Sequence, residues 1–118
     1  MADIEYTKWI RYPVAQLRFS MDTERGSPTR FLVQLERLVE DEWLEVVRFD
    51  HDNEGEQSHD IREEGLHMDI YRDGEKYLVR DDFPPMGLNI APAYAQAYIE
   101  SEADRLLRRF DQWHNLTT

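Results

Sequence analysis

The sequence predicts an α+β fold: an antiparallel sheet of about five strands, arranged as a meander, with one long C-terminal helix packed on one face. Three observations lead to this prediction. Apolar and polar residues alternate through much of residues 14–83, turn-forming residues interrupt these runs, and the apolar period becomes helical from residue 90. Because the 118 residues contain no repeat and no long linker, we expect a single domain over residues 1–118.

The first two central strands are expected at residues 14–22 and 30–40. Residues 14–22 alternate Ala15, Leu17, Phe19 and Met21 with polar neighbours, as a half-buried strand does. A turn over residues 24–29, which contains Gly26 and Pro28, connects the two strands. A change of phase near Leu38-Val39 predicts a β-bulge.

The next strand is expected at residues 43–50, after a tight hairpin turn at Asp41-Glu42. Both of its faces are partly apolar, which is typical of a central strand. Residues 52–65 are polar and contain two glycines, so we expect a long surface loop there.

The last two strands are expected at residues 66–72 and around Tyr77 and Val79. The sequence Asp73-Gly74 between them predicts a two-residue hairpin turn, because glycine adopts positive φ without steric penalty. The return strand ends before Pro84-Pro85.

A helix is expected over residues 90–113. Its apolar face, at spacings of three, four and seven, comprises Ala95, Tyr98, Ile99, Ala103, Leu106, Phe110 and Trp113. Asn89 is the expected N-cap, and Pro92 suits the first turn. The N-terminal segment, residues 1–12, contains Trp9 and is expected to lie along a sheet edge or against a second copy of the chain.

A single helix covers only one face of such a sheet, so the other face is expected to be polar and open. The residues expected there are Gln16, Arg18, Ser20, Gln34, Glu36, Arg48, His67, Asp69, Tyr71 and Arg80. This face is either simply solvated, as is common in antiparallel sheets, or a functional site.

Composition excludes several classes of protein. The chain has no cysteine, which excludes disulfides, thiol catalysis and cysteine-ligated metals. It has no apolar run of membrane-spanning length, and its acidic N-terminus does not resemble a signal peptide, so we expect a soluble cytoplasmic protein with no membrane partner.

The charge balance is strongly acidic, with 25 acidic and 14 basic residues and a net charge of −11. This field opposes RNA binding, which depends on clustered basic residues. Lys8 and Lys76 are the only lysines, and acid excess with few lysines suits a high-salt, halophilic cytosol. An ordinary acidic domain and a binder of a basic partner are the alternatives.

Three of the four histidines lie between residues 51 and 67, each beside an aspartate. The candidate catalytic residues are therefore Arg48, Asp50, His51, His59 and His67, because imidazole exchanges protons near neutral pH and carboxylates orient it. A solvated loop and a divalent metal site are alternatives. The histidine spacing matches no zinc motif, so no metal or other cofactor is expected.

A second candidate group is Arg18, Tyr71 and Arg80, which are expected to share the open face with Arg48 and His67. Arginine binds phosphate through two parallel hydrogen bonds, and tyrosine can stack on a base, so these residues are the candidate substrate-binding residues. The alternative is that they pair with Glu36, Asp69 and Asp82 across the strands.

The segment Val46-Val47-Arg48-Phe49-Asp50-His51-Asp52-Asn53, followed by Ser58-His59-Asp60 and the hairpin to Tyr77, resembles the TumE-like proteins of prokaryotic toxin–antitoxin systems. The resemblance covers residues 30–83. Arg48, Asp50 and His59 match positions of its motif. It implies a small cytosolic toxin that acts on RNA and has an antitoxin partner.

Two functions from different classes follow. The first is a toxin component of this kind, with RNA-directed activity at the candidate residues. The second is a non-catalytic interaction domain that forms a homodimer through its open sheet face or through the segment that contains Trp9. A metal-dependent hydrolase at the histidine loop is a third alternative.

Overall fold

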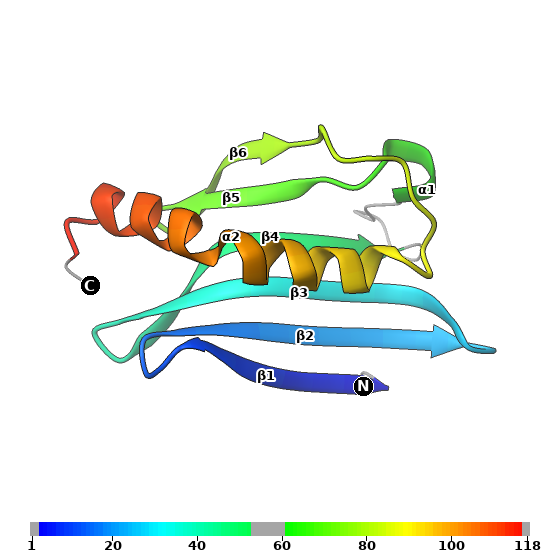
Figure 1. Cartoon of the computed structure of the whole chain (residues 1–118), viewed down its shortest axis with the longest axis horizontal. Coiled ribbons are helices and arrows are strands. Elements are labelled where there is room, and N and C mark those ends of the chain that lie inside the picture. Colours follow the sequence, from blue (N-terminus) through cyan, green and yellow to red (C-terminus); the bar gives the residue numbers. More distant parts are fainter. Residues whose placement is uncertain (1–2, 53–60, 117–118) are drawn as a thin grey trace.

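The computed structural model describes residues 3–52 and 61–116. Six strands form one antiparallel sheet in sequence order, and the long helix α2 lies across one of its faces (Figure 1). The elements are β1 (Ile4–Arg11), β2 (Ala15–Glu24), β3 (Ser27–Val39), β4 (Glu42–Asp52), α1 (Ile61–Glu64), β5 (Met68–Arg72), β6 (Glu75–Arg80) and α2 (Ala91–Trp113). The predicted α+β meander with a C-terminal helix is confirmed, with six strands instead of five.

The additional strand is β1, which lies along one edge of the sheet and pairs with β2 from Ile4 opposite Met21 to Arg11 opposite Ala15. Most of its side chains are exposed. An edge strand that buries little has only a weak alternation of apolar and polar residues, so its sequence did not identify it as a strand.

Three hairpins have two-residue turns with positive φ at both positions: Arg25-Gly26, Glu40-Asp41 and Asp73-Gly74. This geometry matches the twist of the flanking strands. The turn at Asp73-Gly74 is confirmed. The turn expected at Asp41-Glu42 lies one residue earlier, at a place that no glycine marks, and the turn expected over residues 24–29 is only Arg25-Gly26.

A β-bulge in β4 determines which of its residues face the helix. Leu35 pairs with Val47, but Glu36 pairs with Glu45, so Val46 is the extra residue. Val46 and Val47 are both buried. The bulge predicted near Leu38-Val39 therefore lies on the neighbouring strand, and it accounts for the two-sided apolar pattern of residues 43–50.

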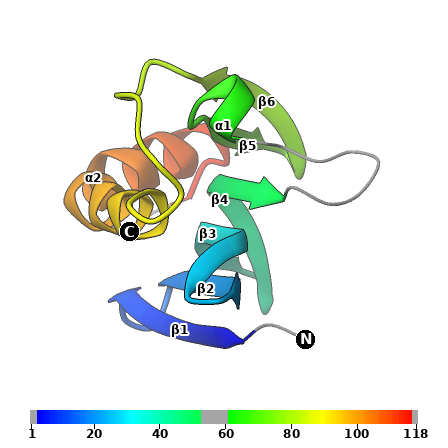
Figure 2. The same ribbon diagram turned by 90° about the vertical axis from the view of Figure 1, so that its right-hand side faces the viewer.

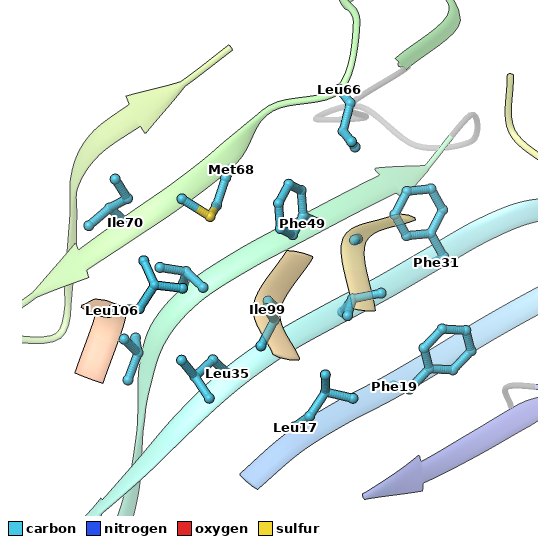
Figure 3. Close-up of a cluster of buried hydrophobic side chains, with 14 of the residues drawn as sticks. Leu17, Phe19, Phe31, Leu35, Phe49, Leu66, Met68, Ile70, Ile99 and Leu106 are labelled. Carbon is cyan, nitrogen blue, oxygen red and sulfur yellow. The ribbon is translucent and has the colours of Figure 1, made fainter. Parts of the chain in front are cut away.

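The core lies between α2 and the sheet, where α2 packs mainly on β3 and β4. Leu17, Phe19 and Ile70 contribute to the same buried cluster as Ile99 and Leu106 of the helix (Figure 3). This confirms the predicted inward faces of the strands and the helix. Leu107, absent from the expected helix face, is also fully buried.

The helix and the loop before it differ locally from prediction. Ile90, not Asn89, is the N-cap of α2, and no side chain caps it, while Pro92 lies in the first turn as expected. The polar loop expected over residues 52–65 is shorter, because β4 continues through Asp52 and residues 61–64 form α1. Residues 53–60 of that loop lie outside the described residues.

Candidate functional site

The candidate site is the face of the sheet opposite α2, here called the open face (Figure 2). Its side chains alternate with those of the core along β2, β3, β4 and β5. They include Gln16, Arg18, Ser20, Gln34, Glu36, Arg48, Asp50, Asp69 and Tyr71. Several of these polar side chains are buried although none of the helices in residues 3–52 and 61–116 covers them, because they pack against one another.

Glu36 lies at the centre of the hydrogen-bond network on the open face and is only 5% exposed. Its carboxylate accepts hydrogen bonds from Gln16 Nε2 at 2.8 Å, Arg18 Nε at 3.1 Å and Gln34 Nε2 at 2.6 Å. Three donors satisfy the hydrogen-bonding capacity of this buried carboxylate. Arg18 is therefore engaged in the cross-strand pairing that was the alternative to substrate binding.

Arg48 extends this network from β3 across β4. Its Nε donates to Gln34 Oε1 at 2.9 Å and its Nη2 donates to Glu45 Oε2 at 2.7 Å, while its guanidinium lies 5.5 Å from the centre of the Tyr71 ring. Burial raises the pKa of Tyr71 to about 12, and the carboxylates of Glu45 and Asp69 act in the same direction, whereas Arg48 lowers it. Tyr71 is therefore a neutral phenol near neutral pH.

Asp69 is a buried carboxylate on the same face, with its side chain 3% exposed. Its Oδ2 lies 3.3 Å from Lys76 Nζ of β6. Its Oδ1 has no hydrogen-bond partner among the described residues. The cations of the open face are therefore matched by Glu36, Glu45 and Asp69, which leaves this surface without a net positive potential for phosphate.

His51 lies on the opposite side of the sheet from Arg48 and Asp50. It is fully buried, and its ring stacks on Phe31 with centroids 6.0 Å apart. The backbone N–H of Ile61 donates to His51 Nδ1 at 3.1 Å. A ring nitrogen that accepts a backbone hydrogen bond is unprotonated, so the neutral ring carries its proton on Nε2. The structure thus makes His51 a link between β4 and α1.

Arg80 was expected on the open face, and this expectation is wrong. The register of β5 and β6 shifts at Tyr77, which places Arg80 opposite the core residue Met68. Its Nη1 donates to Tyr98 Oη of α2 at 2.6 Å, and its Nε and Nη2 donate to Asp82. A bulge inverts the phase of the residues that follow it, so alternation alone predicted the wrong face.

The two remaining candidate histidines differ in position. His67 is half-buried and directly precedes β5. The pairing of β5 with β4 begins at Met68, opposite Phe49, so His67 lies one residue before the paired part of the strand. His59 lies outside the described residues. Within the described ranges, no group of three or more His, Asp or Glu side chains is arranged to hold a metal ion.

Polar contacts between β1 and α2 were not anticipated. Tyr6 Oη donates to Gln96 Oε1 at 2.5 Å, Lys8 Nζ donates to Glu100 Oε1 at 2.6 Å, and Arg11 Nη2 donates to Asp104 Oδ1 at 3.1 Å. The helix partners are spaced by four residues, so they lie along one edge of α2. The four-residue spacing of Gln96, Glu100 and Asp104 was visible in the sequence. It indicates contacts with β1 only after β1 is known to be a strand.

A groove of about 360 Å³ lies between the start of α2 and the β2–β3 hairpin. Its lining includes Phe19, Met21, Pro28 and Pro92. Among the lining residues in the described part of the chain, Tyr6 is the only titratable one, and its hydroxyl already donates to Gln96. The groove therefore has the shape to hold an apolar group but lacks the acid–base residues that catalysis requires.

Fold and open face together define a small α+β domain, an antiparallel meander covered by one helix. The chain belongs to the family described as "Domain of unknown function (DUF7718)", whose sequence profile matches residues 1–116. No curated protein and no solved structure matches the chain. Among the described residues, no helix combines the length and apolar character needed to cross a membrane.

Proposed function

We propose that this domain functions by self-association through the edges of its sheet. One observation carries the proposal: of the eight large hydrophobic side chains that are exposed in the described parts of the chain, seven lie on the two edge strands or next to them. They are Ile4, Tyr6, Trp9 and Tyr12 at β1, and Tyr77, Leu78 and Val79 on β6.

Edge strands present backbone N–H and C=O groups that can pair with another strand. Monomeric proteins usually protect such edges with charged residues, proline or a covering segment. Here both edge strands carry charged residues, but an acidic chain with a net charge of −11 also places most of its exposed apolar side chains there. This distribution supports the proposal that a strand of a second copy pairs with one of these edges.

The open face supports an interaction domain better than a catalytic one. Arg18 and Arg48 are already hydrogen-bonded to Glu36 and Glu45, and Tyr71 has a pKa of about 12. His51, one of the predicted catalytic residues, is fully buried and lies on the opposite face of the sheet from Arg48. These contacts stabilise the sheet and leave few groups on it for chemistry.

Sedimentation equilibrium of the full chain tests the proposal. We expect a mass of twice 14.2 kDa at micromolar concentrations, in buffers between about 0.1 and 2 M salt in which circular dichroism shows folded protein. A mass of 14.2 kDa at every concentration up to about 1 mM would refute self-association as the function.

A second candidate function is the RNA-directed toxin activity implied by the TumE-like resemblance. It is supported by Arg48 and Asp50, which lie two residues apart on the open face of β4, and by His67 immediately before β5; together they would combine a phosphate-binding cation with acid–base groups. This function involves an antitoxin partner. It predicts that expression of the chain arrests growth in a host without that partner.

Substitution separates the two functions. Arg48→Ala, His59→Ala and His67→Ala should each relieve growth arrest if the chain is such a toxin, while the matched change His114→Ala should not. Absence of arrest, or arrest that none of these substitutions relieves, would remove the toxin proposal and leave self-association unaffected.

A further inference from the structure

The two sheet edges differ in how well each can pair with a copy of itself. In β6 the exposed apolar side chains are consecutive: Tyr77, Leu78 and Val79 are exposed by 51%, 48% and 51%. No described strand pairs with the outer side of β6, which forms the top edge of the sheet in Figure 1. An uncharged apolar run on an open edge is typical of a strand that pairs with another chain.

We propose that two copies of the chain pair antiparallel through the full length of β6, so that Glu75 of each copy lies opposite Arg80 of the other. This inference rests on the proposed self-association and identifies its surface. Full overlap of residues 75–80 with their symmetry equivalents fixes the pairs: Glu75 with Arg80, Lys76 with Val79, and Tyr77 with Leu78.

The bulge at Tyr77 makes this register consistent with the two faces of the sheet. Lys76 pairs with Tyr71 and Val79 pairs with Asp69, so both belong to the open face. Glu75 pairs with Arg72 and Arg80 pairs with Met68, which places both on the helix side. Leu78 pairs with the core residue Ile70, and the bulged Tyr77 contacts Trp113 of α2, so these two also lie on the helix side. Residues directly opposite in antiparallel strands point to the same face, and the three kinds of pair in the proposed register satisfy this condition.

Charge and apolar contacts then agree with the register. The apolar pair Tyr77–Leu78 occurs twice at the centre of the interface, and the oppositely charged pair Glu75–Arg80 occurs once at each end. Directly opposite pairs of both kinds stabilise antiparallel strands. A shift by one residue in one direction would place Lys76 opposite Arg80 and Glu75 opposite Asp81, which opposes like charges. A shift in the other direction would place Arg80 opposite Gly74 and lose the charge pair with Glu75.

Tyr77 is already held in place by its own chain. Its ring centroid lies 5.4 Å from that of Trp113, and the guanidinium of Arg72 lies 5.2 Å from Tyr77 and 5.1 Å from Trp113. A side chain that is ordered before association loses less conformational entropy when a partner binds. The apolar surface at the centre of the interface is therefore preorganised.

The edge at β1 does not offer an equivalent pairing. Full-length pairing of β1 with its own copy would place Tyr6 opposite Trp9, although Tyr6 contacts α2 and Trp9 pairs with Gln16 of the open face. It would also place Ile4 opposite Arg11. In this arrangement of β1, Tyr6 and Trp9 would point to opposite faces of the sheet, and an apolar side chain would lie opposite a charged one. We therefore place the dimer interface at β6.

Charge reversal tests the register. Glu75→Arg should raise the dimer dissociation constant about tenfold or more at the lowest salt in which the protein is folded, since symmetry repeats the repulsion with Arg80. The double variant E75R/R80E should dimerise more tightly than Glu75→Arg alone, although it also loses the contacts of Arg80 with Tyr98 and Asp82. Glu5→Arg makes the same change in net charge on β1 and serves as the matched control. A native-like constant for Glu75→Arg would overturn the proposal.

Cysteine pairing provides a second test, because the chain has no cysteine of its own. An equimolar mixture of Glu75→Cys and Arg80→Cys chains should form the mixed disulfide on oxidation. Residue 75 lies about 16 Å from its own equivalent in this register, beyond disulfide reach, so Glu75→Cys alone should not cross-link. Cross-linking of Glu75→Cys alone, or no mixed disulfide in a dimeric sample, would exclude the register while leaving self-association in place. A monomeric native chain would refute both.

Discussion

Arg37 of β3 and Asp111 of α2 form an ion pair in the interior of the protein, with Nε and Oδ1 3.2 Å apart. Their side chains are 7% and 6% exposed. Because Arg37 lies on the helix side of the sheet, the pair joins the C-terminal half of α2 to the strand beneath it. A buried pair of this kind specifies one docking position for the helix at a high desolvation cost.

Breaking this pair should destabilise the fold. Asp111→Ala leaves Arg37 buried without its carboxylate, so we expect the free energy of unfolding to fall by about 3 kcal/mol in a urea titration. Arg105→Ala, which removes an exposed pair with Glu102 on the same helix, should change it by less than about 1 kcal/mol. Equal effects of the two substitutions would show that the Arg37–Asp111 pair has no special role.

His51 should act on stability rather than on chemistry. His51→Ala removes a buried ring and leaves the Ile61 N–H without its acceptor, so we expect a loss of about 3 kcal/mol in the free energy of unfolding. His51→Asn, whose Oδ1 can take the place of Nδ1, should lose less. If both variants unfolded like the native protein, the structural role of His51 would be refuted.

The β3–β4 turn contains a residue, Asp41, whose substitution should stabilise the fold. Asp41 has a φ of 67°, a left-handed conformation that is unfavourable for any residue with a side chain but not for glycine. Asp41→Gly should raise the free energy of unfolding by about 1 kcal/mol. The control, Glu42→Gly at the first residue of β4, should lower it. Thermal unfolding that ranks these variants in the opposite order would contradict the described turn.

Acid should weaken the attachment of β1 to α2. The hydrogen bond from Lys8 holds the pKa of Glu100 below its ordinary value of 4.5, so folding favours the ionised carboxylate. The stabilisation is complete above pH 4.5 and is lost as the pH falls through the lowered value. The difference in unfolding free energy between native protein and Glu100→Gln should therefore be largest near pH 7 and shrink towards pH 3. A difference that does not change with pH would contradict this pairing.

Salt should stabilise the chain if its acidic composition reflects a high-salt cytosol. At about 1 M salt the Debye length falls to about 3 Å, which screens the repulsion of a net charge of −11. We expect the urea midpoint to rise between about 0.1 and 2 M sodium chloride. Unchanged stability over this range would remove the halophilic interpretation.

The sequence predicted the parts of the fold that depend on burial. Leu17, Phe19 and Ile99 follow the periods of a half-buried strand and an amphipathic helix, and those periods record which face meets the core. His51 follows the same phase as Val47 and Phe49, so its burial was also visible in the sequence. Its proximity to aspartates led instead to a catalytic interpretation.

Other features depend on contacts that sequence patterns do not encode. The bulge at Tyr77 moved Arg80 to the helix side, and the strand β1 became evident only from its pairing with β2. The pairing of Arg18 with Glu36 depends on strand register, which is fixed by turn length. Arg18, Arg48 and Tyr71 do share the open face as predicted, but their bonding partners required coordinates.

Amide hydrogen exchange along β6, measured as a function of protein concentration, tests the central claim of pairing between copies most directly. We predict that protection of residues 75–80 increases with concentration, as outward-facing amides become bonded to a second copy, while protection of residues 4–11 in β1 stays constant. Exchange in β6 that is the same at a concentration where the chain sediments as a monomer and at one where it sediments as a dimer would contradict the claim.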